Sequence, residues 1–323
     1  MPTDDDVFRR YLIDEFLEDY QTRRVSRRDT LKLLAGITGS LSIAGVLMAA
    51  CAPTAPVPTA VAPTTPPAPT ARPANTPIPD DQRVAANDPA IRAETVSFRS
   101  GADMITGYLA RPAVGNGPFP AILECPANRG LTDHNMDVTR RLAKSGYVGL
   151  SLDLVSREGG TAKHDRTAIP GLLTQGGVAR HVGDFKAAFD YLQGQSFVQK
   201  ENIGMIGFCF GGGMTLATVL QVPGIKAAVP FYGPPPADFS NISKVNAAVL
   251  ELVGDQDAIA QRLPDVEKQF KDAGKTFQYK VYPGAAHAFY DDQMENPPLQ
   301  FNPPVAKQAW GDALAWLDKY LKA

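Results

Sequence analysis

The 323-residue chain lacks the residues and patterns that mark several classes of protein. It holds three cysteines, too few for a disulfide scaffold, and it has neither a Cys-x-x-Cys pair nor a cysteine–histidine cluster that would predict a metal site. The net charge is only −2, and no basic block with interleaved aromatic residues indicates nucleic-acid binding. We therefore expect no metal, no cofactor and no nucleic-acid partner.

Residues 1–51 have the pattern of an export signal. The sequence Ser-Arg-Arg-Asp-Thr at 26–30 resembles a twin-arginine motif, and the apolar stretch 33–50 that follows is only just long enough to span a bilayer. It ends in Leu-Met-Ala-Ala-Cys, which resembles a lipoprotein cleavage site and implies a lipid on Cys51. This predicts export across a bacterial cytoplasmic membrane, to a lipid-anchored or periplasmic location. The alternative is an amphipathic anchor helix that stays attached, and the acidic segment 4–20 receives no role from the sequence.

Residues 52–80 form a predicted disordered linker. From 52 to 79 the chain is mostly Pro, Ala, Thr and Val, with Arg72 as its one charged residue, so it cannot bury a core and should sample polyproline II. An ordinary interdomain linker is the alternative. Residues 81–323 have the length of one α/β domain with a full core. We expect this domain to be a monomer.

Strand and helix patterns alternate along 81–323. This alternation predicts an α/β fold with a mostly parallel sheet and helices on both faces, and in such sheets ligands bind beyond the carboxyl ends of the strands. The expected strands are 94–100, 104–111, 119–125, 147–152, 203–207, 225–231, 248–253 and 277–282, and the expected helices are 136–145, 178–193, 211–219, 263–273 and 305–321.

The most specific motif surrounds Cys209. This residue is at the centre of Gly-Phe-Cys-Phe-Gly at 207–211, directly after an apolar run. The pattern is that of a nucleophile elbow, Gly-x-nucleophile-x-Gly, with sulfur in place of the serine oxygen. Glycines two before and two after the nucleophile keep Cβ atoms out of a crowded turn. The alternative is a small buried cysteine in a glycine-rich junction.

Two later loops supply partners for this thiol. Asp257 and His287 each follow a predicted strand, and the order nucleophile, acid, base is that of the α/β-hydrolases. His287 can take the thiol proton, and Asp257 can hold its tautomer and stabilise the imidazolium. Asp255 is an alternative acid. The remaining histidines are alternative bases: His134, His164 and His181.

Together these motifs resemble the dienelactone hydrolase family, a cysteine branch of the α/β-hydrolases. The matching segments are Gly-Phe-Cys-Phe-Gly-Gly at 207–212, Gly-Asp-Gln-Asp at 254–257, Tyr-Pro-Gly-Ala-Ala-His-Ala-Phe at 282–289, and Ile-Leu-Glu at 122–124 followed by 137–143. The resemblance covers residues 96–321.

The resemblance implies roles that spacing alone does not give. Glu124 would approach the nucleophile and control its proton, with substrate binding shifting the carboxylate and leaving a thiolate paired with protonated histidine. A strand-end carboxylate bound to Arg129 or Arg157 is the alternative. The backbone N–H groups of Cys125 and Phe210 would hold the oxyanion. Strand alternation should turn the Cys125 side chain away from the pocket, which argues against a disulfide with Cys209.

The departures from the family concern substrate recognition. The founding enzymes bind a substrate carboxylate with two arginines, and Arg157 matches one of them, although it can equally be a structural arginine. The other position falls on Asp291, which would repel a carboxylate. The sequence thus predicts a hydrolase that cleaves an ester or lactone bond through Cys209, His287 and Asp257. Alternatives are a general carboxylesterase or thioesterase on the same residues, a peptidase-like relative, and a non-catalytic surface lipoprotein.

Overall fold

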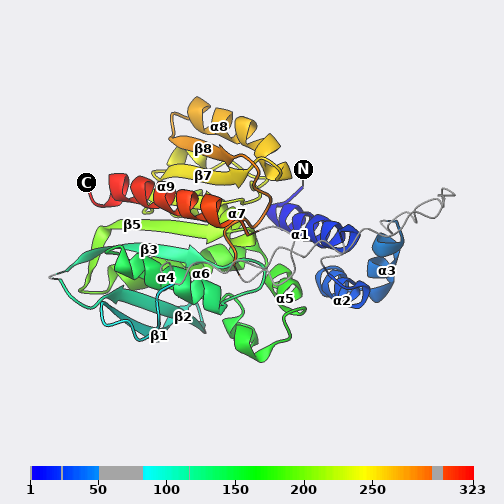
Figure 1. Ribbon diagram of the computed structural model, residues 1–323, viewed down its shortest axis with the longest axis horizontal. Coiled ribbons are helices and arrows are strands. Elements are labelled where there is room, and N and C mark those ends of the chain that lie inside the picture. The colour runs from blue at the N-terminus through cyan, green and yellow to red at the C-terminus, as the bar shows by residue number, and fades with distance from the viewer. Residues whose placement is uncertain (1, 23–24, 51–82, 116, 293–300) are drawn as a thin grey trace, which may run out of the picture.

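The computed structural model describes residues 2–22, 25–50, 83–115, 117–292 and 301–323 (Figure 1). The predicted linker at 52–80 and the predicted lipidation site at Cys51 lie outside the described residues.

A single eight-stranded sheet forms the centre of the domain, with the order β1-β2-β4-β3-β5-β6-β7-β8. The hairpin β1–β2 is antiparallel, and so is the pairing of β2 with β4, while β3 to β8 are parallel. This confirms the predicted mostly parallel α/β sheet. The strands are β1 (Ile91–Ser100), β2 (Asp103–Pro112), β3 (Phe119–Cys125), β4 (Val148–Leu152), β5 (Val198–Phe208), β6 (Ala227–Phe231), β7 (Ala248–Gly254) and β8 (Phe277–Tyr282).

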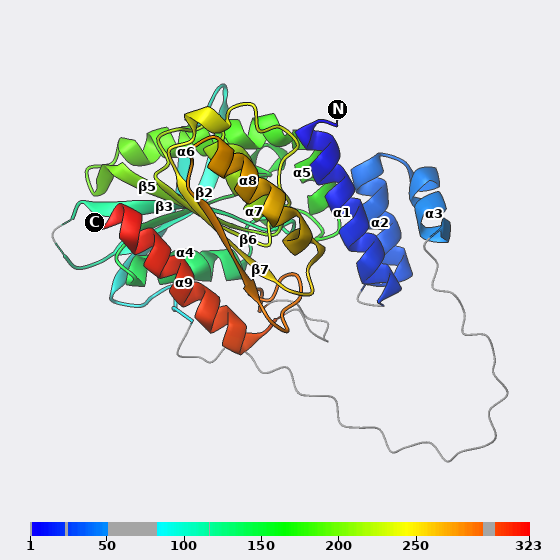
Figure 2. The ribbon, with the colours of Figure 1, turned by 90° about the horizontal axis from the view of Figure 1, so that it is seen from above.

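Helices cover both faces of this sheet, as predicted. Figure 2 shows α4 and α9 on one face and α6 and α8 on the other. The central strands β4, β6 and β7 are buried along their whole length, because a sheet covered on both sides exposes neither set of alternating side chains. The helices of the domain are α4 (Asp133–Lys144), α5 (Ile169–Gly176), α6 (Val178–Gln193), α7 (Phe210–Val219), α8 (Leu263–Asp272) and α9 (Pro303–Leu321).

Three further helices precede the domain: α1 (Asp4–Gln21), α2 (Arg27–Thr38) and α3 (Leu41–Ala50). Helix α1 begins with a reciprocal capping box between Thr3 and Asp6. The apolar stretch of the predicted signal does not form one helix, because α2 ends where Gly39 takes a left-handed conformation. None of the helices in the described part of the chain has the length and apolar character needed to cross a bilayer.

Candidate active site

Cys209 lies at the sharp turn between β5 and α7, in a strained backbone conformation with φ 54° and ψ −120°. The two flanking glycines are also required by the close packing of the turn, which leaves no space for a side chain at either position. A Cβ atom on Gly207 would lie 2.1 Å from the carbonyl oxygen of Gly211, and a Cβ atom on Gly211 would lie 2.1 Å from that of Cys125. This is the geometry of a nucleophile elbow, which aims the side chain beyond the carboxyl edge of the sheet.

The structure brings Asp257 and His287 to the same edge, after β7 and β8 respectively. The Nδ1 atom of His287 lies 2.7 Å from Asp257 Oδ2. The ligand atoms of Cys209 and His287 lie within 4.8 Å of each other. Asp255 points elsewhere and accepts a hydrogen bond from the backbone N–H of Gly284 at 2.9 Å. Sulfur, imidazole and carboxylate therefore form one connected group.

Burial and neighbouring charges shift the pKa values of His287 and Cys209. Burial alone would lower the pKa of His287, but the charge and hydrogen bond of Asp257 hold it well above its ordinary value. Burial raises the pKa of the Cys209 thiol, and the charge of Glu15 raises it further, against the opposing hydrogen bond of His287. The arrangement as folded thus favours a neutral thiol beside a charged imidazole.

Glu124, near the end of β3, is fully buried. Its carboxylate accepts a hydrogen bond from Asn135 Nδ2 at 2.9 Å and another from the hydroxyl of Ser151. Burial raises its pKa to about 7, in spite of these hydrogen bonds. The side chain can therefore gain or lose a proton near neutral pH, and its hydrogen-bond partners are the amide of Asn135 and the hydroxyl of Ser151 rather than Arg129 or Arg157.

The predicted oxyanion donors lie on either side of the elbow. Phe210 is the first residue of α7, where a backbone N–H has no acceptor within the helix. Cys125 is the last residue of β3 and pairs in register with Gly207 of β5. The thiols of Cys125 and Cys209 are both free, and both residues are buried.

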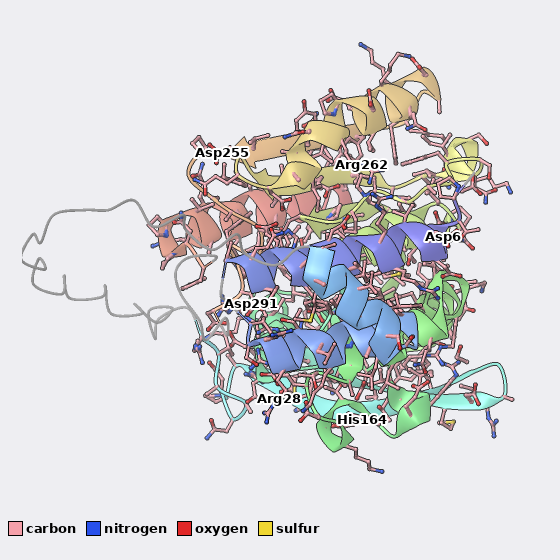
Figure 3. The ribbon with its side chains drawn as sticks, turned by 90° about the vertical axis from the view of Figure 1, so that its right-hand side faces the viewer. Asp6, Arg28, His164, Asp255, Arg262 and Asp291 are labelled. Carbon is pink, nitrogen blue, oxygen red and sulfur yellow. The ribbon has the colours of Figure 1, made fainter. Side chains whose placement is uncertain are left out.

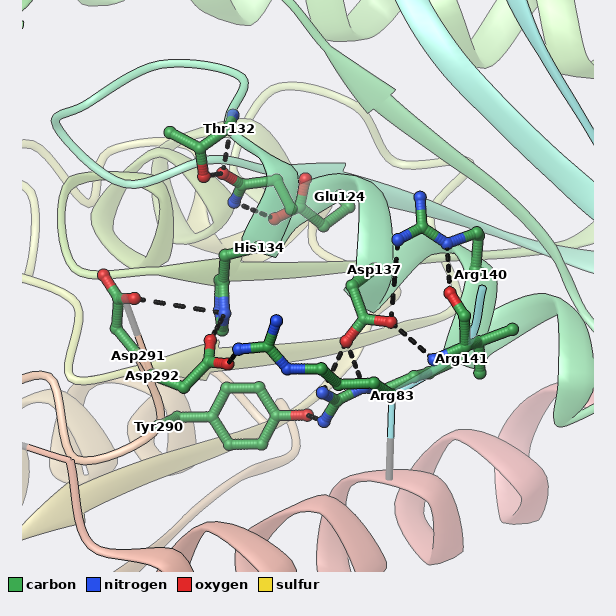
Figure 4. Close-up of polar contacts among 12 residues, drawn as sticks. Arg83, Glu124, Thr132, His134, Asp137, Arg140, Arg141, Tyr290, Asp291 and Asp292 are labelled. Atoms are coloured by element: carbon green, nitrogen blue, oxygen red, sulfur yellow. Dashed lines mark hydrogen bonds and ion pairs between the residues drawn. The ribbon is translucent and has the colours of Figure 1, made fainter. Parts of the chain in front are cut away.

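The other histidines have separate surroundings. His181 Nε2 bonds the carbonyl of Leu173, and His164 Nε2 bonds that of Glu158. His134 shares a cavity lining with Cys209, and its Nδ1 lies 2.6 Å from Asp292 and 3.9 Å from Asp291 (Figure 4).

The cluster around His134 has the composition of a metal-binding group, since one ligand atom from His134, Asp291 and Asp292 lies within 4.8 Å of each of the others. Arg83 forms an ion pair with Asp292 and already supplies positive charge there (Figure 4). Asp291 also lines the cavity at Cys209.

Arg157 is held away from this cavity, and the described residues that line it do not include Arg157. Its guanidinium makes a two-pronged contact with Asp184, at 2.7 and 2.9 Å, and also bonds Asp103 at 2.5 Å. These contacts join the loop after β4 to α6 and to the start of β2.

Four residues near the site were not identified from the sequence. Ser151 and Asn135 bond Glu124, and the parallel register that pairs Glu124 with Ser151 is the signal that could have located the first of them. Tyr11 and Glu15 come from α1, far away along the chain. The hydroxyl of Tyr11 lies 3.2 Å from Cys209 Sγ and 2.8 Å from His287 Nε2.

A strand-to-helix nucleophile turn, with acid and base beyond later parallel strands, defines an α/β-hydrolase. The model of the dienelactone hydrolase family matches residues 105–321. The chain is 30% identical to "Putative carboxymethylenebutenolidase" of Methylorubrum extorquens, over 76% of this chain and 87% of that protein. It is 28% identical to "Probable 2-oxo-3-(5-oxofuran-2-ylidene)propanoate lactonase" of a Bradyrhizobium species, over 72% of this chain and 96% of that protein.

A solved structure agrees with these matches. The crystal structure of "Putative Dienelactone Hydrolase" from Klebsiella pneumoniae superposes with a TM-score of 0.64 at 28% identity, over 72% of this chain and all of that one. The chain therefore belongs to the dienelactone hydrolase family and is a hydrolase with the α/β-hydrolase fold.

Proposed function

We propose that this protein hydrolyses ester or lactone bonds, with Cys209 as nucleophile, His287 as base and acid, and Asp257 as the residue that orients His287. The observation that carries the proposal is the meeting of these three side chains at one edge of the sheet, with Asp257 Oδ2 2.7 Å from His287 Nδ1. Nothing else in the described fold combines a nucleophile at a strained elbow with an oriented base.

The reaction follows from the roles of these groups. His287 takes the proton of Cys209, and the thiolate attacks the carbonyl carbon. The backbone N–H groups of Cys125 and Phe210 hold the resulting oxyanion. As the tetrahedral intermediate collapses, His287 gives its proton to the leaving alkoxide, and a thioester remains on Cys209. His287 then deprotonates a water molecule that attacks the thioester, which releases the carboxylic acid and restores the thiol.

Glu124 has a supporting part in this proposal. A buried carboxyl group with a pKa of about 7 can exchange a proton at neutral pH. Glu124 directly precedes Cys125, whose backbone N–H is a proposed oxyanion donor. We assign it to tuning the protonation of the Cys209 region when substrate enters. Arg157 is left out of the proposed substrate site, because its guanidinium is already bound by Asp184 and Asp103.

The substrate class comes from the relatives and from the lining of the cavity. The names of the relatives describe enzymes that open butenolide-type lactones. The acidic Asp291 stands where a carboxylate-binding arginine is expected, which disfavours an anionic substrate. We therefore propose an uncharged lactone or ester. A general carboxylesterase on the same residues is the second candidate, and the same acidic side chain favours it.

We further propose that residues 1–51 are an export leader, that Cys51 carries lipid after cleavage, and that 52–80 tether the catalytic domain 81–323 to the cell envelope. The twin arginines support this proposal, since Arg27 and Arg28 are exposed at the start of α2. Mass spectrometry of the mature N-terminus, with Cys51→Ala as the comparison, would test it. An unmodified N-terminus at Met1 would contradict it.

The catalytic proposal is tested by Cys209→Ala, assayed with a panel of uncharged lactones and p-nitrophenyl esters. Met104→Ala is the matched control, because it removes a sulfur-containing side chain that is exposed on β2. We expect hydrolysis to be lost in the first variant and kept in the second. Equal turnover by Cys209→Ala and the unmodified protein would refute the assignment.

A further inference from the structure

Helix α1 lies beside the carboxyl ends of the parallel strands (Figure 1). Its residue Tyr11 reaches both Cys209 and His287. Viewed from that side in Figure 3, the helices that precede the domain stand in front of it, with Arg28 labelled among them. Helix α1 turns an apolar side inward, on which Phe8, Leu12 and Phe16 are buried. The position of this helix therefore results from packing and not from a loose association.

Several contacts fit α1 closely to the domain. The ring of Phe8 packs edge-on against that of Phe210, the first residue after the nucleophile, with ring centroids 5.6 Å apart. A Cβ atom on Gly213 would lie 2.7 Å from the Phe8 ring, so the helix after the elbow leaves room for this one side chain. The first turn of α7 thus carries both the proposed oxyanion donor, Phe210, and the surface on which Phe8 of α1 packs, here called the seat for α1.

The amino end of α1 is fixed by polar contacts. Asp5 Oδ1 accepts a hydrogen bond from the backbone N–H of Val178 at 2.7 Å, which caps the start of α6. Asp4 Oδ1 accepts from the backbone N–H groups of Ala237 and Asp238, at 2.7 and 3.1 Å. The acidic residues of this segment therefore bind backbone donors of the catalytic domain.

Further along α1, two side chains occupy the catalytic centre. Tyr11 places its hydroxyl between Cys209 Sγ and His287 Nε2, where both groups would need to meet substrate. Glu15 lies 3.6 Å from Cys209 Sγ through Oε2, and its Oε1 accepts a hydrogen bond from Asn128 at 3.1 Å. A carboxylate beside the sulfur opposes formation of the thiolate.

The cavity volumes around Cys209 are consistent with α1 covering the nucleophile. Among the cavities formed by the described residues, the one that Cys209 lines has a volume of about 40 Å³. Ligand sites usually measure roughly 300–1,000 Å³. A cavity of about 370 Å³ lies beside α1 against Asp257 and His287, but Cys209 is not among the described residues that line it. The cavity that is large enough for a substrate therefore does not reach Cys209 Sγ, because α1 lies between them.

We propose that α1 is an internal inhibitor that closes the catalytic site for as long as it stays attached and docked. This inference rests on the proposed function of Cys209. Because Arg27 and Arg28 are exposed while α1 is docked, the twin-arginine segment can be recognised in the closed protein. Cleavage before Cys51 would separate α1, α2 and α3 from the domain, and release of α1 would then open the site. The protein would be silent before export and active after it.

The test uses the full-length protein and one substitution that undocks α1. Phe8→Asp places a charge in the seat on α7, whereas Arg9→Glu changes the charge of a neighbouring exposed residue and serves as the matched control. Two rates are measured: alkylation of Cys209 by iodoacetamide, read by mass spectrometry of the peptide that contains it, and hydrolysis of a p-nitrophenyl ester. Circular dichroism and urea unfolding report whether the domain stays folded.

We expect both rates to rise in Phe8→Asp and to stay unchanged in Arg9→Glu. A covered state that opens on the order of 0.1–10% of the time predicts a rise of roughly 10- to 1,000-fold. A second variant, Tyr11→Phe with Glu15→Gln, keeps the helix docked and should raise both rates less than Phe8→Asp does. If Phe8→Asp fails to fold, a protease site inserted within 52–80 and cut after purification, followed by separation of the leader, provides the same comparison.

The outcomes separate the two proposals. Faster alkylation without any ester hydrolysis supports the inhibitor and contradicts the hydrolase. Hydrolysis that is equal in the unmodified protein and Phe8→Asp supports the hydrolase and overturns the inhibitor. Hydrolysis that falls when α1 is undocked, with the domain folded, also overturns it, because Tyr11 or Glu15 would then be assisting the reaction.

Discussion

Asp257 accepts a hydrogen bond from His287 Nδ1 at 2.7 Å, which leaves Nε2 of the same ring facing Cys209. The second carboxylate oxygen of Asp257 accepts from the backbone N–H of Ile259 at 2.9 Å. The carboxylate is therefore fixed on one side by the backbone, and it orients the imidazole on the other.

Replacing this carboxylate tests its effect on the imidazole. Asp257→Asn should keep the bond to the Ile259 N–H through its amide oxygen but turn an N–H toward His287 and favour the wrong tautomer. We expect turnover of an aryl ester to fall by a factor on the order of 10⁴, with little loss of stability. Asp255→Asn, two residues away and bonded to Gly284, should retain activity. Similar losses in both variants would show that Asp257 has no special role.

The glycines of the elbow should tolerate no side chain. Gly207→Ala would bring a methyl group to 2.1 Å from a backbone oxygen, so the turn at Cys209 has to move. We expect the free energy of unfolding to fall by about 3 kcal/mol or more, which is at or above the top of the usual range for single substitutions. Hydrolysis should be lost as well.

Gly183→Ala is the matched control for this substitution. It lies on the exposed side of α6 with nothing within 4 Å of the new methyl group, and it should stabilise the protein by about 1 kcal/mol. Urea unfolding of the two variants measures the contrast. An elbow that accepts alanine without loss of stability would contradict the close packing described above.

Glu124 should make stability depend on pH. Its pKa is about 7 in the folded protein, against an ordinary value of 4.5, so between these values the folded state binds the proton more tightly than the unfolded chain does. The free energy of unfolding should therefore fall as pH rises from about 4.5 to about 7, by up to about 3 kcal/mol from this group. Urea unfolding across this range, compared with Glu124→Gln, isolates the contribution. Parallel curves for the two proteins would contradict it.

Asp291 is expected to set the charge preference of the substrate. Asp291→Arg places a cation in the lining of the Cys209 cavity, and we expect turnover of lactones that carry a carboxylate to increase relative to uncharged ones. Glu201→Arg makes the same charge change at an exposed position on β5 and should leave this ratio unchanged. The ratio of kcat/KM for the two lactone classes is the measurement. An unaltered ratio in Asp291→Arg would show that residue 291 does not meet the substrate.

Much of the domain could be predicted from the sequence because its signals are local. Short apolar runs predict the alternation of strands and helices. For example, the helix predicted at 178–193 has the same bounds in the structure. The elbow depends on Gly207 and Gly211, which lie only two residues before and two residues after Cys209. The spacing of Asp257 and His287 after strands sufficed to bring them to one edge.

The contacts that escaped prediction join segments far apart in the chain. Ser151 meets Glu124 only because β4 pairs with β3 in one register, and Asn135 arrives from the next helix. Tyr11 and Glu15 belong to an acidic segment with no catalytic motif. Nothing in residues 4–20 indicates that their partners are 113 to 276 positions away.

Helices α2 and α5 touch at the level of their backbones. A Cβ atom on Gly171 would lie 2.8 Å from the backbone of Gly36, so α5 cannot add a side chain there without pushing α2 aside. The export leader proposed above would therefore be fitted to the surface of its own domain. Under that proposal, a foreign signal sequence in its place would lack this backbone contact, so the leader and the domain would be expected to change together in evolution.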